Sequence, residues 1–202
     1  MEILIARHTR VAVDPNLCYG THDIPLADSF LEEAQAVKDR LFSFFPFDKV
    51  YSSPLTRAAK LAQFLQDGDI VYDDRLKEIE FGPWEMITWE DIGLEKFSQW
   101  VEDVDENGPP TETYRDMTNR LKSFFDELIE KRPGEKILIT THSGAIRCIL
   151  ALYSGSPLDK IFHFNINYGG ILHLKYDQYS DEDYQKYPAI LLPKMIIKGF
   201  NI

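Results

Sequence analysis

Residues 2 to 11 read EILIARHTRV, and this stretch decides the fold. Its first half, EILIA, is a short apolar run that is typical of a strand buried in a sheet. The run ends abruptly in two arginines that flank a histidine, Arg7, His8 and Arg10. A strand that only filled a core would not end on so much positive charge. The pattern therefore predicts a buried strand whose end carries a functional site.

The rest of the chain is acidic, which restricts what this site can bind. The 202 residues include 33 Asp and Glu against 22 Lys and Arg, a formal net charge of −11. Proteins that bind nucleic acid or anionic membranes need broad basic surfaces, so this balance argues against both classes. A small anionic ligand is compatible with it, because a few arginines in a cleft set the local potential. We therefore expect the partner to be a small anionic molecule.

Cysteine usage and the N-terminus predict a soluble, cytoplasmic protein. Cys18 and Cys148 are too few and too far apart for a disulfide framework or a C-x-x-C motif, and they are interpreted as reduced thiols. The N-terminus has no basic region followed by a long apolar run. Nowhere are there about 18 consecutive apolar residues, as a membrane-spanning helix requires.

Apolar periodicity predicts that strands and helices alternate along the chain. The predicted strands cover residues 2–6, 49–53, 69–74, 136–141, 169–176 and 189–199. The predicted helices cover residues 28–45, 55–65, 88–101, 113–134 and 142–155. Such alternation is typical of a three-layer α/β/α sandwich with a mostly parallel sheet. We expect one domain over 1–202, with a lid-like excursion at about 79–110.

Local signals place the ends of three of these helices. Ser29 and Glu32 have the spacing of a capping box before the first helix, and Thr113 and Asp116 stand near the cap of the fourth. Pro54 stands at a plausible start of the second helix.

Three predicted strands end in polar groups, and in a parallel sheet those ends meet at one edge. They are the strands before RHTR, SSPLTR and HSG, so the sheet should bring six side chains together. The convergent residues are Arg7, His8, Arg10, Arg57, His142 and Ser143.

These residue types predict a site for a phosphoryl group, so we expect the partner to be a small phosphorylated metabolite. Arginine binds phosphate oxygens in pairs, and the N–H groups of the helix after His142 add further donors. A neutral imidazole is a competent nucleophile toward phosphorus. Metal-ligand spacing is absent and arginines repel a divalent cation, so we expect neither a metal nor another cofactor. The remaining need is a proton donor for the leaving group, for which RLKEIEFGPWE (75–85) offers Glu78, Glu80 and Glu85.

Four motifs, in order over residues 1 to about 150, resemble those of the histidine phosphatase superfamily, in its phosphoglycerate-mutase-like branch. Arg7 and His8 match its Arg-His-Gly motif. Residues 52–58, SSPLTRA, match its Ser-Ser-Pro-x-x-Arg-Ala motif. Residues 76–85 match its Leu-x-Glu-x-x-(aromatic)-Gly-x-Trp-Glu motif, and His142 opens a helix after a late strand.

The resemblance implies roles for individual residues. His8 would be the phosphohistidine nucleophile, and Glu78 the proton donor and acceptor. Arg7, Arg57 and His142 would bind the phosphoryl group. The pattern CYGTHDIPL (18–26) resembles a family segment at the substrate mouth, which implies that Tyr19 and Gly20 contact substrate.

Some residues depart from the family motifs, and a longer stretch suggests a substrate. Thr9 replaces the family glycine, Arg10 stands where Glu or a small polar residue is commoner, and Asp14 or Asn16 is left to stand for a family asparagine. The stretch RHTRVAVDPNLCYGTHDIPL (7–26) is similar to the opening of α-ribazole phosphatases of the cobalamin pathway. The compact chain favours hydrolysis, so α-ribazole 5′-phosphate is the first candidate substrate. The alternatives are a phosphoglycerate mutase and a non-catalytic phosphate-binding module.

Two further segments carry expectations about packing and assembly. Five aromatic residues of the excursion are expected mainly to pack beneath it, and part of the set to line a pocket for a planar leaving group. They are Phe81, Trp84, Trp89, Phe97 and Trp100. The apolar KMIIKGF (194–200) is expected to form an edge strand through which a homodimer pairs.

Overall fold

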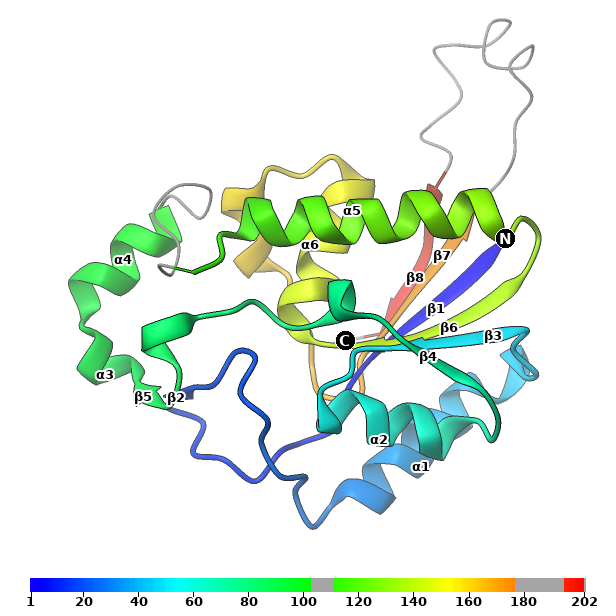
Figure 1. The fold of residues 1–202 in the computed structure, drawn as a ribbon, viewed down its shortest axis with the longest axis horizontal. Helices are drawn as coiled ribbons and strands as arrows, with labels where there is room; N and C mark the ends of the chain where they lie inside the picture. The colour runs from blue at the N-terminus through cyan, green and yellow to red at the C-terminus, as the bar shows by residue number, and fades with distance from the viewer. Residues whose placement is uncertain (103–110, 177–194, 202) are drawn as a thin grey trace, which may run out of the picture.

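The computed structural model describes residues 1–102, 111–176 and 195–201 (Figure 1). Its main sheet has six strands in the spatial order β4-β3-β6-β1-β7-β8. These strands are β1 (Glu2–Arg7), β3 (Lys49–Ser52), β4 (Ile70–Tyr72), β6 (Lys136–Thr141), β7 (Ile171–Tyr176) and β8 (Met195–Asn201). The first four in spatial order pair in parallel, whereas β7 is antiparallel to both β1 and β8. The predicted mostly parallel sheet is confirmed.

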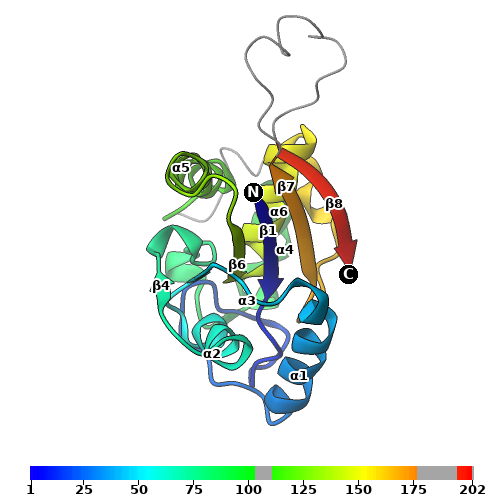
Figure 2. The ribbon, with the colours of Figure 1, turned by 90° about the vertical axis from the view of Figure 1, so that its right-hand side faces the viewer.

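Helices cover both faces of the sheet, which gives the three layers visible in Figure 1. On one face lie α1 (Phe30–Leu41) and α2 (Thr56–Leu65), and on the other lie α5 (Tyr114–Lys131) and α6 (Ser143–Ser154). Figure 2 shows β1, β7 and β8 side by side between these layers. None of the helices in the described residues has the length and apolarity needed to cross a membrane.

Strand alternation divides the core between the two faces. In β1, Ile3 and Ile5 pack with α5 and α6, whereas Leu4 packs with α1 and α2. In β6, Ile137 and Leu138 separate in the same way. Because both faces of these central strands are covered, each reads as a continuous apolar run rather than as alternation.

The excursion lies beside one end of the sheet, at the left in Figure 1. It contains β5 (Ile87–Thr88), which pairs with β2 (Leu17–Cys18), followed by α3 (Trp89–Ile92) and α4 (Leu94–Glu102). The predicted helix over 88–101 is thus two helices, because Gly93 at φ +94° interrupts it. The last part of the excursion, 103–110, lies outside the described residues.

One predicted capping box is absent and one predicted helix start is wrong, although Ser29 is the N-cap residue of α1. Ser29 makes no capping bond to the backbone of α1, because its hydroxyl donates to the side chain of Glu33 (2.7 Å). The second helix begins at Thr56 rather than at Pro54, and the Thr56 N–H donates to Asp23 (2.9 Å). By contrast, the capping box of Thr113 and Asp116 before α5 is present.

The C-terminal strand is partly as predicted. β8 begins at Met195, and the predicted residues 189–194 lie outside the described part of the chain. β8 is an edge strand of the main sheet, as expected. Pairing of this edge with a second copy of the chain stays a prediction.

Candidate active site

His8 lies directly after the central strand β1 and is buried. Its Nδ1 is 2.7 Å from the carbonyl oxygen of Thr9. A carbonyl can only accept, so Nδ1 carries the proton and Nε2 keeps its lone pair. Burial, reinforced by the positive charges of Arg7 and Arg57, holds the pKa of His8 well below its usual value. The side chain is therefore a neutral imidazole with a free nitrogen at neutral pH.

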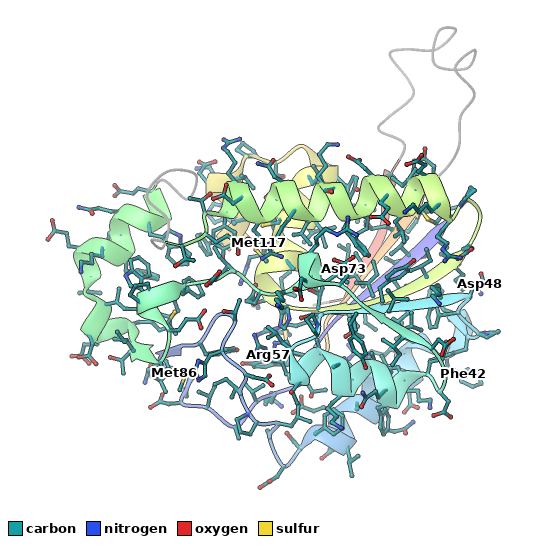
Figure 3. All side chains as sticks on the ribbon, viewed as in Figure 1. Phe42, Asp48, Arg57, Asp73, Met86 and Met117 are labelled. Atoms are coloured by element: carbon teal, nitrogen blue, oxygen red, sulfur yellow. The ribbon has the colours of Figure 1, made fainter. Side chains whose placement is uncertain are left out.

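Arg57, on the first turn of α2, is fully buried and links the other residues of the site. Its Nε donates to His142 Nδ1 (3.2 Å), and its terminal nitrogens donate to the carbonyls of His22 (2.8 Å) and Gly20 (2.6 Å). Burial lowers the pKa of Arg57, and the negative charge of Glu78 opposes that shift. Figure 3 shows Arg57 in the interior, between Met86 of the excursion and Asp48 at the far end of the sheet.

His142, between β6 and α6, is the second buried imidazole. Since its Nδ1 accepts from Arg57, Nε2 carries the proton and donates to Ser53 Oγ (2.8 Å). Its ring centroid is 5.1 Å from that of His8. Burial and the charge of Arg57 lower its pKa well below the usual value, so this imidazole is also neutral.

Arg7 stands at the end of β1, beside His8. One terminal nitrogen donates to the carbonyl of Ile166 (2.5 Å), and the guanidinium lies 3.8 Å from the ring centre of Tyr168. Its Nε is buried and has no hydrogen-bond partner among the described residues. The hydroxyl of Thr9 is in the same condition. Buried polar atoms without partners are rare in folded proteins and are expected where a ligand completes the site.

Glu78 comes from the loop after β4 and is held against the start of α6. Its Oε2 accepts from the Gly144 N–H (3.1 Å) and from the hydroxyl of Ser143 (3.3 Å). A Cβ on Gly144 would lie 2.3 Å from Glu78 Oε1, so this contact requires glycine. The positive end of the α6 dipole faces the carboxylate.

Gly20 and Tyr19, which the resemblance assigned to the substrate mouth, both contact Arg57. Gly20 has φ +38°, and a Cβ there would collide with Glu85 and Phe81. Glu85 supports this turn, because its Oε1 accepts from the Thr21 N–H (2.8 Å) and from the Phe81 N–H (3.1 Å). The Tyr19 ring lies over the Arg57 guanidinium at 5.2 Å.

Three residues named in the sequence analysis lie apart from this cluster: the predicted site residue Arg10, and Asp14 and Asn16, the two alternatives for the family asparagine. Arg10 is exposed, and its guanidinium is paired with Glu33 (3.0 Å). Asp14 and Asn16 are exposed in a turn, in which Asp14 accepts from the Asn16 N–H (2.9 Å). The structure thus brings together Arg7, His8, Arg57, His142 and Ser143 with Tyr19, Gly20 and Glu78, and leaves Arg10 on the surface.

Tyr168 belongs to the site, although no pattern in the sequence singled it out. Its ring lies over Arg7, 5.6 Å from the His8 ring, and its hydroxyl is 3.4 Å from that of Tyr19. It comes from an irregular turn before β7, which carries no motif. Burial and the neighbouring Tyr168 raise the pKa of Tyr19, so the Tyr19 phenol stays protonated.

A cavity of about 810 Å³ adjoins the cluster and is bordered by Tyr19, Glu78, Ser143 and Tyr168. The excursion supplies more of its lining residues than any other segment. α6 supplies Ser143, Gly144 and Arg147, and α5 and η4 (Leu158–His163) each supply one aromatic residue. The aromatic residues that line it include Phe81, Trp89, Phe97, Trp100, Tyr114 and Phe162. Trp100 stacks on Trp89, and its indole Nε1 is buried without a partner in the described residues.

Comparison with known proteins identifies the family. The model of the histidine phosphatase superfamily (branch 1) matches residues 3–182, and the chain belongs to this family. The chain is 28% identical over 180 residues to the adenosylcobalamin/alpha-ribazole phosphatase of Salmonella typhimurium, covering 84% of this chain and 87% of the relative. It is 25% identical over 189 residues to phosphoserine phosphatase 1 of Hydrogenobacter thermophilus, covering 87% of each.

A solved structure shows the same fold. A mutant phosphoserine phosphatase of Entamoeba histolytica, in complex with phosphoserine, superimposes with a TM-score of 0.82 at 20% identity. The match covers 99% of this chain and 96% of that one. The resemblance inferred from the motifs and the predicted fold are both confirmed. The chain is a phosphomonoester hydrolase of the histidine phosphatase family.

Proposed function

We propose that the protein hydrolyses its phosphomonoester through a phosphohistidine formed on His8. The observation that carries this proposal is the state of His8, which is a buried neutral imidazole with its Nδ1–H fixed on a backbone carbonyl. The free Nε2 lies in a cluster with two guanidiniums, which neutralise phosphoryl oxygens as charge develops on them.

The first chemical step transfers the phosphoryl group to His8. The Nε2 lone pair attacks phosphorus, the bond from phosphorus to the leaving oxygen breaks, and Glu78 gives that oxygen a proton. Arg7 and Arg57 bind the phosphoryl oxygens. The Nε of Arg7 supports its assignment, because it has no partner in the described part of the chain and a bound oxyanion satisfies a buried donor.

The second step returns the enzyme to its starting state. Glu78, now a carboxylate, takes a proton from a water molecule, whose oxygen attacks phosphorus while the bond to Nε2 breaks. Inorganic phosphate leaves, and His8 is again neutral. The positive groups around His8 do for the phosphoryl oxygens what a divalent cation does in other phosphatases, so we propose that no metal takes part. Activity should persist in excess chelator.

The cavity supports a flat aromatic leaving group, and α-ribazole 5′-phosphate is the proposed substrate. Its benzimidazole would stack against Trp89, and a ring nitrogen would accept from the Nε1–H of Trp100, which has no partner among the described residues. A relative with 28% identity carries the name adenosylcobalamin/alpha-ribazole phosphatase, in agreement with this substrate.

Phosphoserine is the second candidate. Arg147 lines the same cavity from α6, where its Nε donates to the Phe164 carbonyl (3.0 Å). The guanidinium would bind the carboxylate of phosphoserine. A relative with 25% identity is named phosphoserine phosphatase 1, which also favours this candidate.

A steady-state comparison of α-ribazole 5′-phosphate, phosphoserine and 3-phosphoglycerate tests the substrate. We expect kcat/KM for α-ribazole 5′-phosphate to exceed the other two by at least about 100-fold, the discrimination that a pocket built for one substrate achieves. A preference for phosphoserine would instead select the second candidate. Transfer of the phosphoryl group to a phosphoglycerate, rather than to water, would show a mutase.

The nucleophile is tested separately with His8→Ala, which should reduce turnover by at least about 1,000-fold. Rapid quenching into base should trap an acid-labile phosphoryl group on the wild-type protein and none on the variant. Wild-type activity in the variant would overturn the proposal. Activity lost without any trapped intermediate on the wild-type protein would leave His8 essential but exclude the phosphohistidine route.

A further inference from the structure

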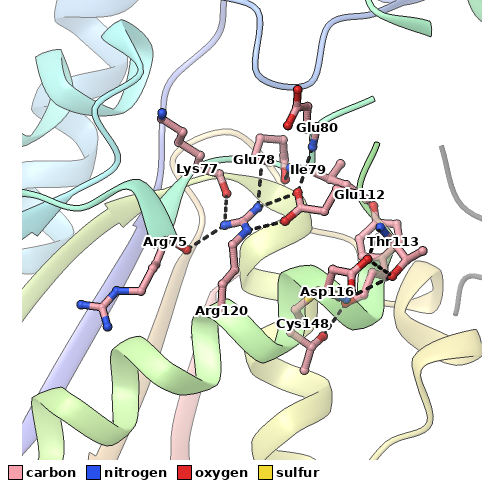
Figure 4. A network of polar contacts seen from close by, with 12 residues as sticks. Arg75, Lys77, Glu78, Ile79, Glu80, Glu112, Thr113, Asp116, Arg120 and Cys148 are labelled. Carbon is pink, nitrogen blue, oxygen red and sulfur yellow. Dashed lines mark hydrogen bonds and ion pairs between the residues drawn. The ribbon is translucent and has the colours of Figure 1, made fainter. Parts of the chain in front are cut away.

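Glu78 stands on a loop without helix or strand, so the position of its backbone depends on side chains from elsewhere. One guanidinium, that of Arg120 on α5, donates to three carbonyl groups in and just before this loop (Figure 4). Its Nη1 donates to the carbonyls of Arg75 (2.7 Å) and Lys77 (2.9 Å), and its Nη2 donates to that of Glu78 itself (3.1 Å).

The remaining donors of Arg120 pair with Glu112, just before α5. Nε lies 2.5 Å from Glu112 Oε1, and Nη2 lies 2.9 Å from Oε2. An arginine has five N–H donors, and these contacts use all five. Lysine has three donors on a single nitrogen and cannot reproduce this planar arrangement.

The loop is also held on either side of these contacts. Glu112 Oε2 accepts from the Glu80 N–H (3.0 Å), two residues after Glu78. On the other side, the Thr141 hydroxyl donates to the Leu76 carbonyl (2.7 Å). The Glu78 carboxylate accepts from the Gly144 N–H, a contact that does not involve Arg120. A shift of the Glu78 backbone would therefore change the direction in which the carboxylate points.

We propose that Arg120 is a positioning residue for Glu78, and that it sets where this carboxyl group meets the leaving oxygen. The inference rests on the proposed function, in which Glu78 is the proton donor. Arg7 and His8 come from β1 and its end, and Arg57 from α2, so none of them stands on the loop that Arg120 holds. Loss of Arg120 should therefore impair protonation of the leaving group more than phosphoryl binding.

Kinetics with two leaving groups test this role in Arg120→Lys. For an alkyl phosphate, whose leaving oxygen needs a proton, we expect kcat/KM to fall by about 100-fold, the lower end of what general acid catalysis provides. For p-nitrophenyl phosphate, whose leaving group departs as the anion, the loss should stay below about threefold. Arg132→Lys is the matched control, because Arg132 directly follows the same helix and pairs with Glu135. Its kinetics should equal those of the wild type.

A double-mutant cycle separates positioning from a general structural effect. If Arg120 acts through Glu78, then Glu78→Gln combined with Arg120→Lys should lose no more activity on the alkyl phosphate than Glu78→Gln alone. Additive losses, or equal losses on both substrates, would overturn the proposal. Should Arg120→Lys fail to fold, Glu112→Gln carries the test, since it weakens the pair without removing the guanidinium.

The Glu78→Gln variant also tells the two proposals apart. If Glu78→Gln alone affects both substrates equally, the proton-donor assignment fails, and with it the proposed function as stated. If Glu78→Gln affects the alkyl phosphate selectively while the Arg120 and Glu112 variants do not, the positioning role alone fails.

Discussion

His8 is held in a single tautomer by its neighbour in the chain, the carbonyl of Thr9. The family motif has glycine at position 9, and the backbone contact does not need one. The side chain of Thr9 instead places a buried hydroxyl next to the nucleophile, without a partner in the described part of the chain. A departure that is visible in the sequence therefore adds a polar group to the site rather than removing one.

The two buried histidines should make the free energy of unfolding depend on pH between about 4.5 and 6.5, a range in which the carboxylates with a lowered pKa contribute no such dependence. The folded-state pKa of His8 and of His142 is lowered by burial, so between that value and about 6.5 the unfolded chain binds protons that the folded chain does not. Their contribution is complete above pH 6.5 and is lost as the pH falls toward the folded-state pKa. Each should reduce the free energy of unfolding by about 1.4 kcal/mol per pH unit below 6.5.

Urea denaturation between pH 5 and pH 7.5 measures this slope. The His8→Asn variant should show a smaller slope than the wild type, whereas substitution of the exposed His163 by asparagine should preserve it. Carboxylates with a lowered pKa, such as Asp73 and Glu33, lose their contribution only below about pH 4.5, outside this window. An unchanged slope in His8→Asn would show that the pKa of His8 is not lowered in the folded protein.

At the scale of elements, strands were easier to predict than helix starts. The apolar runs 2–6 and 136–141 belong to strands covered on both faces, and burial alone dictates such runs. α2 begins at Thr56 rather than at Pro54, and the Thr56 N–H donates to Asp23, more than thirty residues away, a contact that no local pattern shows. The roles of Tyr168 and Arg120 could not be predicted for a similar reason. Their partners, Arg7 and the Glu78 loop, are distant in sequence.

The Glu78 carboxylate is hydrogen-bonded to the start of α6. Gly144, the second residue of this helix, has no room for a side chain beside that carboxylate. Gly144→Ala would place a methyl group 2.3 Å from the present position of Glu78 Oε1, so the carboxylate must move. Alanine is otherwise favourable in a helix, so the free energy of unfolding should change by less than about 1 kcal/mol.

We expect Gly144→Ala to lower kcat/KM on an alkyl phosphate by at least about tenfold while phosphate still inhibits competitively, because a displaced proton donor costs part of the gain from acid catalysis. Gly199→Ala in β8 is the control, since its added Cβ meets nothing within 4 Å. Full activity in Gly144→Ala would mean that Glu78 works from another position.

At the scale of the whole molecule, the sheet and the excursion contribute different parts of the candidate site. The ends of β1, β3 and β6 position the proposed phosphoryl-binding cluster, and α3 and α4 supply much of the wall of the aromatic cavity. The strand ends could be predicted from sequence, because parallel strands bring their carboxyl ends to one edge. The shape of the cavity could not, because it depends on Gly93 breaking the excursion into two helices and on contacts between α4 and η4 such as Trp100 on Phe162.

This division predicts that changes in the excursion alter substrate choice without altering the chemistry. Trp89 lies half-buried on the cavity wall, stacked on Trp100 with 6.1 Å between ring centroids. Trp89→Leu should lower kcat/KM for α-ribazole 5′-phosphate by about tenfold, because aromatic pairing contributes about 0.5–1.5 kcal/mol beyond buried area. The value for phosphoserine should stay within about twofold, since that leaving group offers no ring to stack. Phe42→Leu, at an exposed aromatic far from the cavity, should change neither value. Equal losses on both substrates would mean that Trp89 supports the fold of the excursion rather than the recognition of the leaving group.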